Sequence, residues 1–542
     1  MTGVAERSAK LLALAGLLLA VTASSGSAAG LHRGRMLGVV PHSGSLAAGP
    51  RLFSRSNAVK AADPTMLTFD PSYQTLIDQY LTDVAHDSGS TNSVYSVATQ
   101  YDDSNHVHIQ YQSTFGGSYV DKDPLPANGC NDGADTYCIT DKQIENEIQN
   151  VLNANGWHGG LDRMYFLLTP NGVGSCFDAL GTECTTNTFC AYHNYFADSN
   201  VEDVIYANEP YMGPSGLCIG SNDPTQVQGF PNDVDSDTTI NTISHEHNEA
   251  ITDPLTDPNF LAWTADDGSE NGDLCAYGFG AQTGTGAGSY NQVINGHHYD
   301  LQQEWSNADG GCLQHAGDTN PTPATFGAPP LVYRGGPVMH TNTTYAIYWL
   351  PTARNTVLPK VTPTAAVVNQ TLTTTAGSWA VGGAPYSYQW QRCSSAGTSC
   401  VDIPGATATT YRLTSADRGH KVRSTVRATN VNGASQPAAS AGTALVVDVP
   451  SATKTPHISG PARVGKKLSG NHGSWTYSPK YRYQWLRCNG RGGGCSSIHR
   501  ATRSTYRAAR QDAGHRLRLR VTATNAAGSA TAVSAASSRV KR

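Results

Sequence analysis

The carboxy-terminal part of the chain is an internal duplication, and no other feature constrains its fold as tightly. Eight residues recur at one offset of 95 positions, beginning with Trp390 and Trp485. A repeat at one constant offset predicts two copies of the same small unit, over residues 359–448 and 453–542. The matched positions are Trp390, Cys393, Cys400, Tyr411, Asp417, Gly419, Asn430 and Gly433 in the first copy, and Trp485, Cys488, Cys495, Tyr506, Asp512, Gly514, Asn525 and Gly528 in the second.

Each copy has the size, the short alternating strands and the tryptophan of an all-β immunoglobulin-like sandwich. The run Tyr386–Cys393 resembles the immunoglobulin-like repeats of secreted actinobacterial proteins. The two cysteines of a copy lie seven residues apart, which favours a bridge across one hairpin or loop: Cys393 with Cys400, and Cys488 with Cys495. Such repeats usually serve as spacers or adhesion modules, so the fold alone names no ligand.

A second pattern, His-Glu-x-x-Glu at residues 245–249, supplies the candidate metal ligands and general base of the chain. It lies in a run with helical periodicity, and it differs from the zinc-protease pattern H-E-x-x-H in its last residue. Residues four apart share a helix face, so His245 and Glu249 could reach one cation. Glu246 then stands where a general base belongs. His247 falls on the apolar side, where we expect a buried, hydrogen-bonded histidine.

A catalytic metal site needs a third ligand and one open position. The downstream loop, with Glu270 and Asp273, resembles that of the gluzincin metalloproteases. The resemblance implies that Glu270 is the third ligand and that Asp273 orients His245. Because Glu249 replaces a histidine, the site is harder and more anionic, so Mn²⁺ and Ca²⁺ are alternatives to Zn²⁺. The competing interpretation is a solvated helix face without a metal.

The same region carries a wider family resemblance. Ser244–Pro254, Trp263 and Glu270–Cys275 are similar to secreted bacterial and fungal relatives of the plant Exordium (phosphate-induced) proteins. The resemblance covers roughly residues 64–315 and implies an extracellular, metalloprotease-like α+β domain. Plant members often lack the His-Glu pair, so their biology does not transfer through it. His193 is expected either beside the metal or substrate, or in the core next to a disulfide.

The amino-terminus predicts export. Residues 1–29 are typical of a signal peptide, with Arg7 and Lys10 before the apolar run Leu11–Val21 and small residues at Ser27–Ala29. That run is too short to span a membrane, and no later span is expected. The predicted location is therefore extracellular.

Twelve cysteines, an even number, suit an oxidising compartment. In the first domain we expect Cys130 to pair with Cys138, and Cys275 with Cys312. The spacing leaves the pairing of the other four open. These are Cys176, Cys184, Cys190 and Cys218.

The net charge of −5 is the sum of a strongly acidic region and a strongly basic region. Residues 64–318 hold 36 acidic and three basic residues, whereas residues 453–542 hold 18 basic residues and one acid, Asp512. The basic copy should attract anionic wall polymers or acidic glycans rather than nucleic acid, unless it docks on the acidic domain or is only solvated. In the acidic domain, Asp233, Asp235 and Asp237 are a possible Ca²⁺ loop.

Local patterns give the remaining organisation. After a leader or pro-segment at 30–63, residues 64–315 should form a sheet with helices. Residues 316–358 are typical of a linker with an extra strand, which either pairs back onto the domain or is a remnant of a second copy. We favour pairing back, because an orphan strand would expose an edge. The expected elements are a helix from Asp70–Pro71, strands Val94–Tyr101 and Val107–Tyr111, a helix from Thr140 to Gly156, and buried strands Met164–Leu168 and Val204–Ala207.

Two functions follow from these patterns. The first is a secreted metal-dependent hydrolase, a peptidase acting on peptide or protein substrates. Its cation is held by His245, Glu249 and Glu270, while Glu246 activates water and later protonates the leaving amine. The alternative is a non-catalytic, wall-associated or adhesive protein that binds anionic polymers through its repeats.

Overall fold

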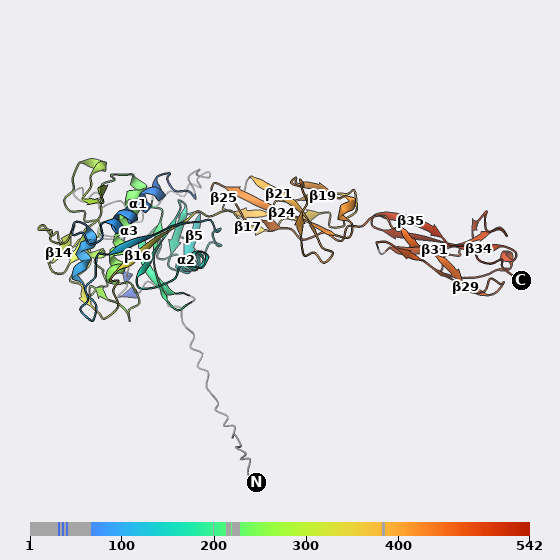
Figure 1. The fold of residues 1–542 in the computed structure, drawn as a ribbon, viewed down its shortest axis with the longest axis horizontal. Coiled ribbons are helices and arrows are strands. Elements are labelled where there is room, and N and C mark those ends of the chain that lie inside the picture. The colour runs from blue at the N-terminus through green and yellow to red at the C-terminus, as the bar shows by residue number, and fades with distance from the viewer. Residues whose placement is uncertain are drawn as a thin grey trace, which may run out of the picture. The chain divides into compact units, whose positions relative to one another are not determined.

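The computed structural model describes most of the chain (Figure 1). The described residues are 31–32, 35–36, 39–41, 67–198, 200–212, 218, 228–381, 385–477 and 479–542. The expected signal peptide and most of the leader lie outside them. The chain divides into two compact units, Met1–Leu350 and Pro351–Arg542. Within the described residues, no helix combines the length and apolar character needed to cross a bilayer.

A six-stranded mixed sheet organises the first unit. Its strand order is β3-β8-β9-β6-β16-β4, and the last four of these strands run parallel. The interior strand β6 is almost wholly buried and apolar, as expected for a parallel strand covered on both faces. The predicted buried strands are confirmed as β6 and β9. The bounds are β3 (Val39–Pro41), β4 (Ser113–Asp121), β6 (Arg163–Thr169), β8 (Phe189–Ala197), β9 (Asp203–Pro210) and β16 (Asn342–Trp349).

The strand β16 returns from the end of the unit to the interior of this sheet. It pairs in parallel with β4 on one side and β6 on the other, so the expected pairing back occurs. The backbone groups on both of its edges are thereby satisfied. The first unit accordingly ends at Leu350, so the expected boundary at residue 315 is too early. Residues 316–350 belong to the unit rather than to a linker.

The described part of the first unit contains three α-helices: α1 (Tyr73–His86), α2 (Asp141–Asn155) and α3 (Val234–Thr252). The predicted limits of α2 are confirmed, because Thr140 forms a capping box with Gln143 and Gly156 closes the helix in a left-handed conformation. The helix α1 begins after Ser72 rather than at Asp70–Pro71. The helix α3 contacts α1, β8 and β9, and is buried from Ser236 to Thr252.

Two expected strands are wrong. Residues Val94–Gln100 form a 3₁₀-helix, η2, and Val107–Tyr111 contributes only a single bridge between His108 and Asp102. The buried residues of η2 run without interruption from Val94 to Ala98, which is not the alternation of a half-buried strand. A short apolar run is compatible with both a strand and a helix, so the tertiary packing around it determines which one forms.

Short elements complete the first unit. Several are two-stranded pairs, and two are 3₁₀-helices around the loops that follow α3. They are β1 (Leu31–His32) with β2 (Arg35–Met36), β5 (Tyr137–Thr140) with β7 (Val173–Cys176), β10 (Trp263–Thr264) with β15 (Val332–Tyr333), β11 (Gln292–Ile294) with β12 (His297–Tyr299), β13 (Glu304–Ser306) with β14 (Gly311–Leu313), and the 3₁₀-helices η3 (Asp273–Cys275) and η4 (Gly286–Gly288).

The second unit consists of two all-β sandwiches, as the duplication predicted. In each, a three-stranded sheet packs against a larger antiparallel sheet, with Trp390 or Trp485 fully buried in the core. Each indole Nε1–H donates a 2.9 Å hydrogen bond to an equivalent carbonyl, that of Ala408 or Arg503. The local environment of the tryptophan is therefore repeated together with the sequence.

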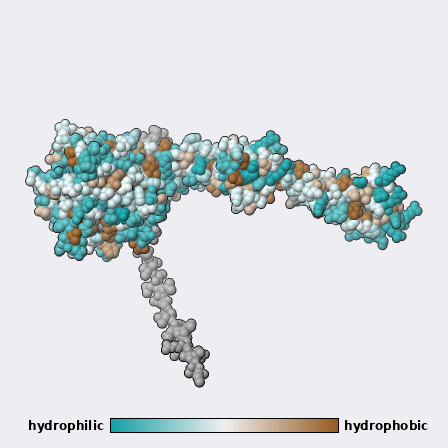
Figure 2. Space-filling view, viewed as in Figure 1, coloured by the Kyte–Doolittle hydropathy of each residue, from teal (hydrophilic) through white to brown (hydrophobic). Residues whose placement is uncertain are grey.

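The strands of the two sandwiches are equivalent in order. The first contains β17 (Arg354–Val357), β18 (Val361–Thr362), β19 (Thr371–Thr374), β20 (Ser378–Ala380), β21 (Tyr386–Cys393), β22 (Val401–Asp402), β23 (Thr410–Arg412), η5 (Ser415–Asp417), β24 (Lys421–Asn430), β25 (Gly433–Ala434) and β26 (Ala438–Ala439). The second contains β27 (Ala452–Lys454), β28 (His457–Ser459), β29 (Lys467–Asn471), β30 (Ser474–Trp475), β31 (Lys480–Cys488), β32 (Ser496–Ser497), β33 (Thr505–Arg507), η6 (Arg510–Asp512), β34 (Arg516–Asn525) and β35 (Gly528–Val533). On the visible face of both units, hydrophobic residues are scattered rather than gathered into one patch (Figure 2).

All twelve cysteines form disulfides, which fits an extracellular protein. The four expected bridges are confirmed: Cys130–Cys138, Cys275–Cys312, Cys393–Cys400 and Cys488–Cys495. The pairing that the sequence left open is Cys176–Cys184 and Cys190–Cys218.

Candidate metal centre

Three parts of the first unit meet at the polar face of α3. The helix supplies His245, Glu246 and Glu249, the strand β8 supplies His193, and the loop between β10 and η3 supplies Glu270. All five side chains are completely buried. The solvated helix face considered from the sequence is therefore excluded. We call these residues, together with Asp273 at the start of η3, the α3 centre.

A glycine lets the loop approach the helix. A Cβ atom at Gly272 would lie 3.1 Å from both Glu249 Oε1 and His245 Cγ, so a larger residue would displace the loop. Two side chains fix the neighbouring backbone: Gln302 donates to the Gly272 carbonyl at 2.9 Å, and Thr252 donates to Asn271 Oδ1 at 2.9 Å. The acidic loop is thus held against the motif helix.

The ligand atoms form two triads that share Glu249. One triad contains His193, Glu249 and Glu270, and the other contains His245, Glu249 and Asp273. In each triad the candidate ligand atoms lie within 4.8 Å of one another. His245 Nε2 lies 2.9 Å from Glu249 Oε1, while His193 Nε2 lies 3.8 Å from Glu270 Oε1.

The predicted ligand set is therefore regrouped. The sequence placed His245, Glu249 and Glu270 around one ion, whereas in the structure the histidine grouped with Glu249 and Glu270 is His193. His193, expected either beside the metal or substrate or in the core next to a disulfide, is completely buried and lies among the candidate ligands. Asp273 lies with His245 and donates its backbone N–H to Glu249 Oε1 at 2.8 Å. Its role in orienting His245 stays a prediction.

The predicted general base has a different partner. Glu246 Oε2 lies 3.0 Å from His193 Nδ1, and the Nε2 atom of the same ring lies 3.1 Å from the carbonyl of Asp253. His193 is thus held between the helix and the segment after it. His247, by contrast, contacts Tyr95 Oη and Asn342 Oδ1 on the other side of α3, which confirms the predicted buried, hydrogen-bonded histidine.

The electrostatics of the centre are dominated by buried acids. Among the described residues, the ion pairs of the α3 centre are made with histidines. Burial raises the pKa of Glu270 well above its usual value, and raises that of Asp253 to about 7. Burial would also raise the pKa of Glu249, but the charge of His245 holds it below its usual value. Two further buried acids, Glu209 on β9 and Glu304 on β13, also have raised pKa values.

Several polar atoms at the centre point into it without an aligned hydrogen bond. Both ring nitrogens of His245 and Oε2 of Glu249 have none among the described residues, although the two side chains are in ion-pair contact. Leaving such groups unsatisfied in the interior costs about 1–3 kcal/mol each. Imidazole nitrogens and carboxylate oxygens are ligands of Zn²⁺ and Mn²⁺, so the residues present fit a divalent cation.

Sequence reasoning missed the outer acids of the site. Glu209 accepts a hydrogen bond from Thr242 on α3, and Glu304 accepts one from Asn271 in the loop. Neither belongs to a short motif. A glutamate inside an apolar strand such as β9 was the available signal, because charged residues are rarely buried without a partner. The Asp-rich run lies at the start of α3, where Asp233 caps the helix by accepting hydrogen bonds from the backbone of Asp235 and Ser236.

No protein-family model and no curated protein matches the chain. Matching solved structures include a Ca²⁺-stabilized adhesin of an Antarctic bacterium (12% identity, 39% of this chain, TM-score 0.22). Others are the titin I-band fragment I67–I69 (18%, 34%, 0.20) and the four N-terminal Ig domains of Dscam1 isoform 6.9 (12%, 38%, 0.18). The chain covers 54%, 64% and 50% of these proteins, less than two thirds of each. Similarity at these TM-scores supports no inference about function.

Proposed function

We propose that this chain is an extracellular protein that binds a divalent cation at the α3 centre and attaches to anionic polymers through its second sandwich. The observation that carries the first part is the convergence of ligand atoms from buried His193, His245, Glu249, Glu270 and Asp273. Glu249 belongs to both triads, so it is the residue on which any bound ion depends most. When bound, the cation would neutralise acids that the interior otherwise penalises.

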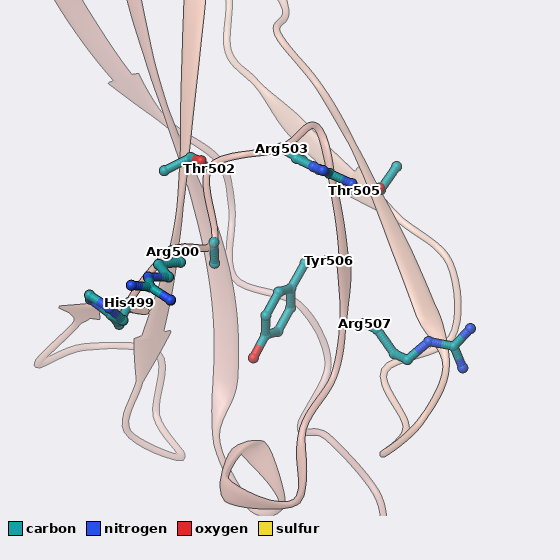
Figure 3. A pocket seen from close by; sticks show the side chains of 8 residues that line it. His499, Arg500, Thr502, Arg503, Thr505, Tyr506 and Arg507 are labelled. Atoms are coloured by element: carbon teal, nitrogen blue, oxygen red, sulfur yellow. The ribbon is translucent and has the colours of Figure 1, made fainter.

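The second part of the proposal rests on charge. The one acid in residues 453–542, Asp512, is fully buried and accepts a 2.7 Å hydrogen bond from Arg487. The exposed arginines of this sandwich are therefore not neutralised within it. Arg500, Arg503 and Arg507 line a surface pocket together with Tyr506 (Figure 3). A concentration of positive charge attracts polyanions such as acidic glycans and wall polymers.

Metal-dependent peptide hydrolysis is the second candidate function. It is favoured by Glu246, which lies beside both triads as the general base of a hydrolase would. A bound cation would polarise the substrate carbonyl, while Glu246 would take a proton from water and pass it to the leaving amine. The burial of Glu246 and its contact with His193 are the reasons for ranking this function second, because a base must reach water and substrate.

Elemental mass spectrometry of the purified chain tests the metal site. We expect about one zinc or manganese ion per chain, lost in Glu249→Gln and retained in His247→Gln, whose side chain lies on the same helix away from the centre. Failure to take up either ion after reconstitution would overturn the proposal.

A peptide-library assay separates the two functions. Hydrolysis that disappears in Glu246→Gln while the metal content is unchanged would make the enzyme the correct assignment. If the metal-loaded chain hydrolyses no peptide, the result supports a bound cation with a structural rather than a catalytic role.

A further inference from the structure

Away from the α3 centre, a second group of carboxylates in the described part of the first unit brings three ligand atoms together. Asp121 ends β4, Asp123 lies two residues later, and Glu147 belongs to α2. Ligand oxygens of the three lie within 4.8 Å of one another. Asp121 is 3% exposed and Glu147 is 7% exposed, whereas Asp123 is open to solvent.

The hydrogen bonds of the two buried acids leave one oxygen of each unused. Asp121 Oδ1 accepts from the backbone N–H of Asp123 at 2.9 Å, and Glu147 Oε2 accepts from Asn150 at 3.3 Å. Asp121 Oδ2 and Glu147 Oε1 are buried and accept no hydrogen bond from an N–H or hydroxyl group among the described residues, although the two carboxyl groups lie within hydrogen-bond reach of each other. Two carboxylates side by side in the interior are unfavourable unless a proton or a metal cation lies between them.

We propose that Asp121, Asp123 and Glu147 form a second cation site, selective for Ca²⁺. Every protein donor is a carboxylate oxygen, which is the ligand that Ca²⁺ prefers. Oxygens that all lie within 4.8 Å of one another are close enough for one ion, with bonds of about 2.4 Å, to contact all three. Solvent access at Asp123 lets water complete the six to eight ligands that Ca²⁺ takes, at distances of about 2.3–2.6 Å. The site contains no imidazole, unlike the α3 centre.

The position of this site gives it a mechanical role. The carbonyl of Asp121 accepts the backbone N–H of Leu350 at 2.8 Å, and the carbonyl of Asp123 accepts the Nε1–H of Trp349 at 2.8 Å. Residues 121–123 therefore hold the last two residues of the first unit. A cation that joins the side chains of Asp121 and Asp123 to Glu147 connects α2 to the last residues of the first unit. The site is independent of any ion at the α3 centre.

Terbium luminescence on the full-length chain tests this site. Tb³⁺ replaces Ca²⁺ at oxygen-rich sites, and Trp349 lies close enough to sensitise its emission. With the α3 centre first supplied with Zn²⁺, we expect saturable emission that CaCl₂ reverses. The apparent affinity for Tb³⁺ should fall by about tenfold or more in Asp123→Asn and in Glu147→Gln, because each removes one carboxylate charge.

The control is Asp162→Asn, which removes a charge from an exposed side chain elsewhere on the same unit. Emission that is absent, or that falls equally in Asp162→Asn and Asp123→Asn, would overturn the proposal. Because Asp123 is exposed, its variant tests the site without disturbing the core. If the chain takes up no zinc but binds Tb³⁺ in an Asp123-dependent way, the proposed metal at the α3 centre is wrong and the second cation site is supported.

Discussion

The two units of the protein bury carboxylates in opposite ways. In the sandwiches, Asp417 and Asp512 are fully buried, and each accepts hydrogen bonds from an arginine and a tyrosine. At the α3 centre, buried acids converge, and their ion-pair partners among the described residues are histidines. An arginine is permanently charged, so the sandwich acids are satisfied by the protein itself.

The comparison shows that burial of an acid does not by itself indicate function. Asp417 has donors for both oxygens, namely Arg392 on Oδ1 and Tyr411 and Thr414 on Oδ2. Both oxygens of Glu249 are in ion-pair contact with histidines, but Oε2 has no aligned hydrogen bond among the described residues. Histidine, unlike arginine, can itself coordinate a metal. The incomplete satisfaction of the acids, more than their number, marks the α3 centre as a ligand site.

The largest expected effect is on the first unit when its metal is removed. An ion present at about 1,000 times its dissociation constant stabilises the folded unit by roughly 4 kcal/mol. A chelator should therefore lower the unfolding temperature of the first unit and leave that of the sandwiches unchanged. Scanning calorimetry of the full chain with and without the chelator measures both. In Glu249→Gln, the chelator should lower the transition of the first unit less than in the wild type, because only the proposed Ca²⁺ site of Asp121, Asp123 and Glu147 remains to be emptied. An equal shift of all transitions would remove the contrast between the units.

The second effect is on the sandwiches. Arg392→Met leaves Asp417 buried without its cation and should reduce the stability of that sandwich by roughly 3 kcal/mol, since breaking a buried pair costs about 3–5 kcal/mol. The lower figure applies because the Arg392 side chain is 27% exposed. Denaturant unfolding measures the loss, and Arg487→Met should reproduce it in the other sandwich. Metal uptake should not change in either variant.

The contributions of two buried acids, Asp141 in the first unit and Asp417 in a sandwich, to stability should change with pH in opposite directions. Burial raises the pKa of Asp141 to about 6, and the hydrogen bonds from Tyr206 and Tyr192 only partly offset that increase. The folded state then binds the proton more tightly, so this contribution is full below about pH 4 and is lost as pH rises towards 6. Burial would raise the pKa of Asp417 too, but the Thr414 backbone and Arg392 hold it below its usual value. Its contribution is present above about pH 4 and is lost below.

Denaturant unfolding of metal-free protein between pH 4 and 7 checks the first of these signs. The difference in stability between the wild type and Asp141→Asn should decrease with rising pH. For Asp417→Asn, the difference from wild type should be constant across that range and shrink only at lower pH. A difference for Asp141→Asn that grows with pH would contradict the assigned direction.

The smallest effect concerns surface charge. Arg500 and Arg503 correspond, at the offset of 95, to Gly405 and Ala408 of the first sandwich. The double variant Arg500→Gly and Arg503→Ala therefore carries residues that this fold already accepts, and Arg500 has a positive φ of 57° that suits glycine. On an anionic resin it should elute at lower salt than the wild type. Elution at unchanged salt would argue against attachment through this surface.

The sequence predicted the parts of the fold that local patterns encode. The motif helix, the Thr140 cap of α2 and the duplication are all readable within a few residues or at one fixed offset. The missed features depend on long-range packing. His193 reaches Glu246 across 53 residues of sequence, and no local pattern specifies that encounter. The 3₁₀-helix η2 was assigned as strand because its apolar run fits both periods.

The placement of β16 sets the order in which the first unit can fold. Residues 342–349 are its last strand to be synthesised, yet they lie between β4 and β6 inside the sheet. Until they emerge from the ribosome, the two flanking strands have no partner on that side. Pairings this distant in sequence form slowly, because a long loop must close first. The first unit therefore cannot complete its sheet until most of its residues have been synthesised.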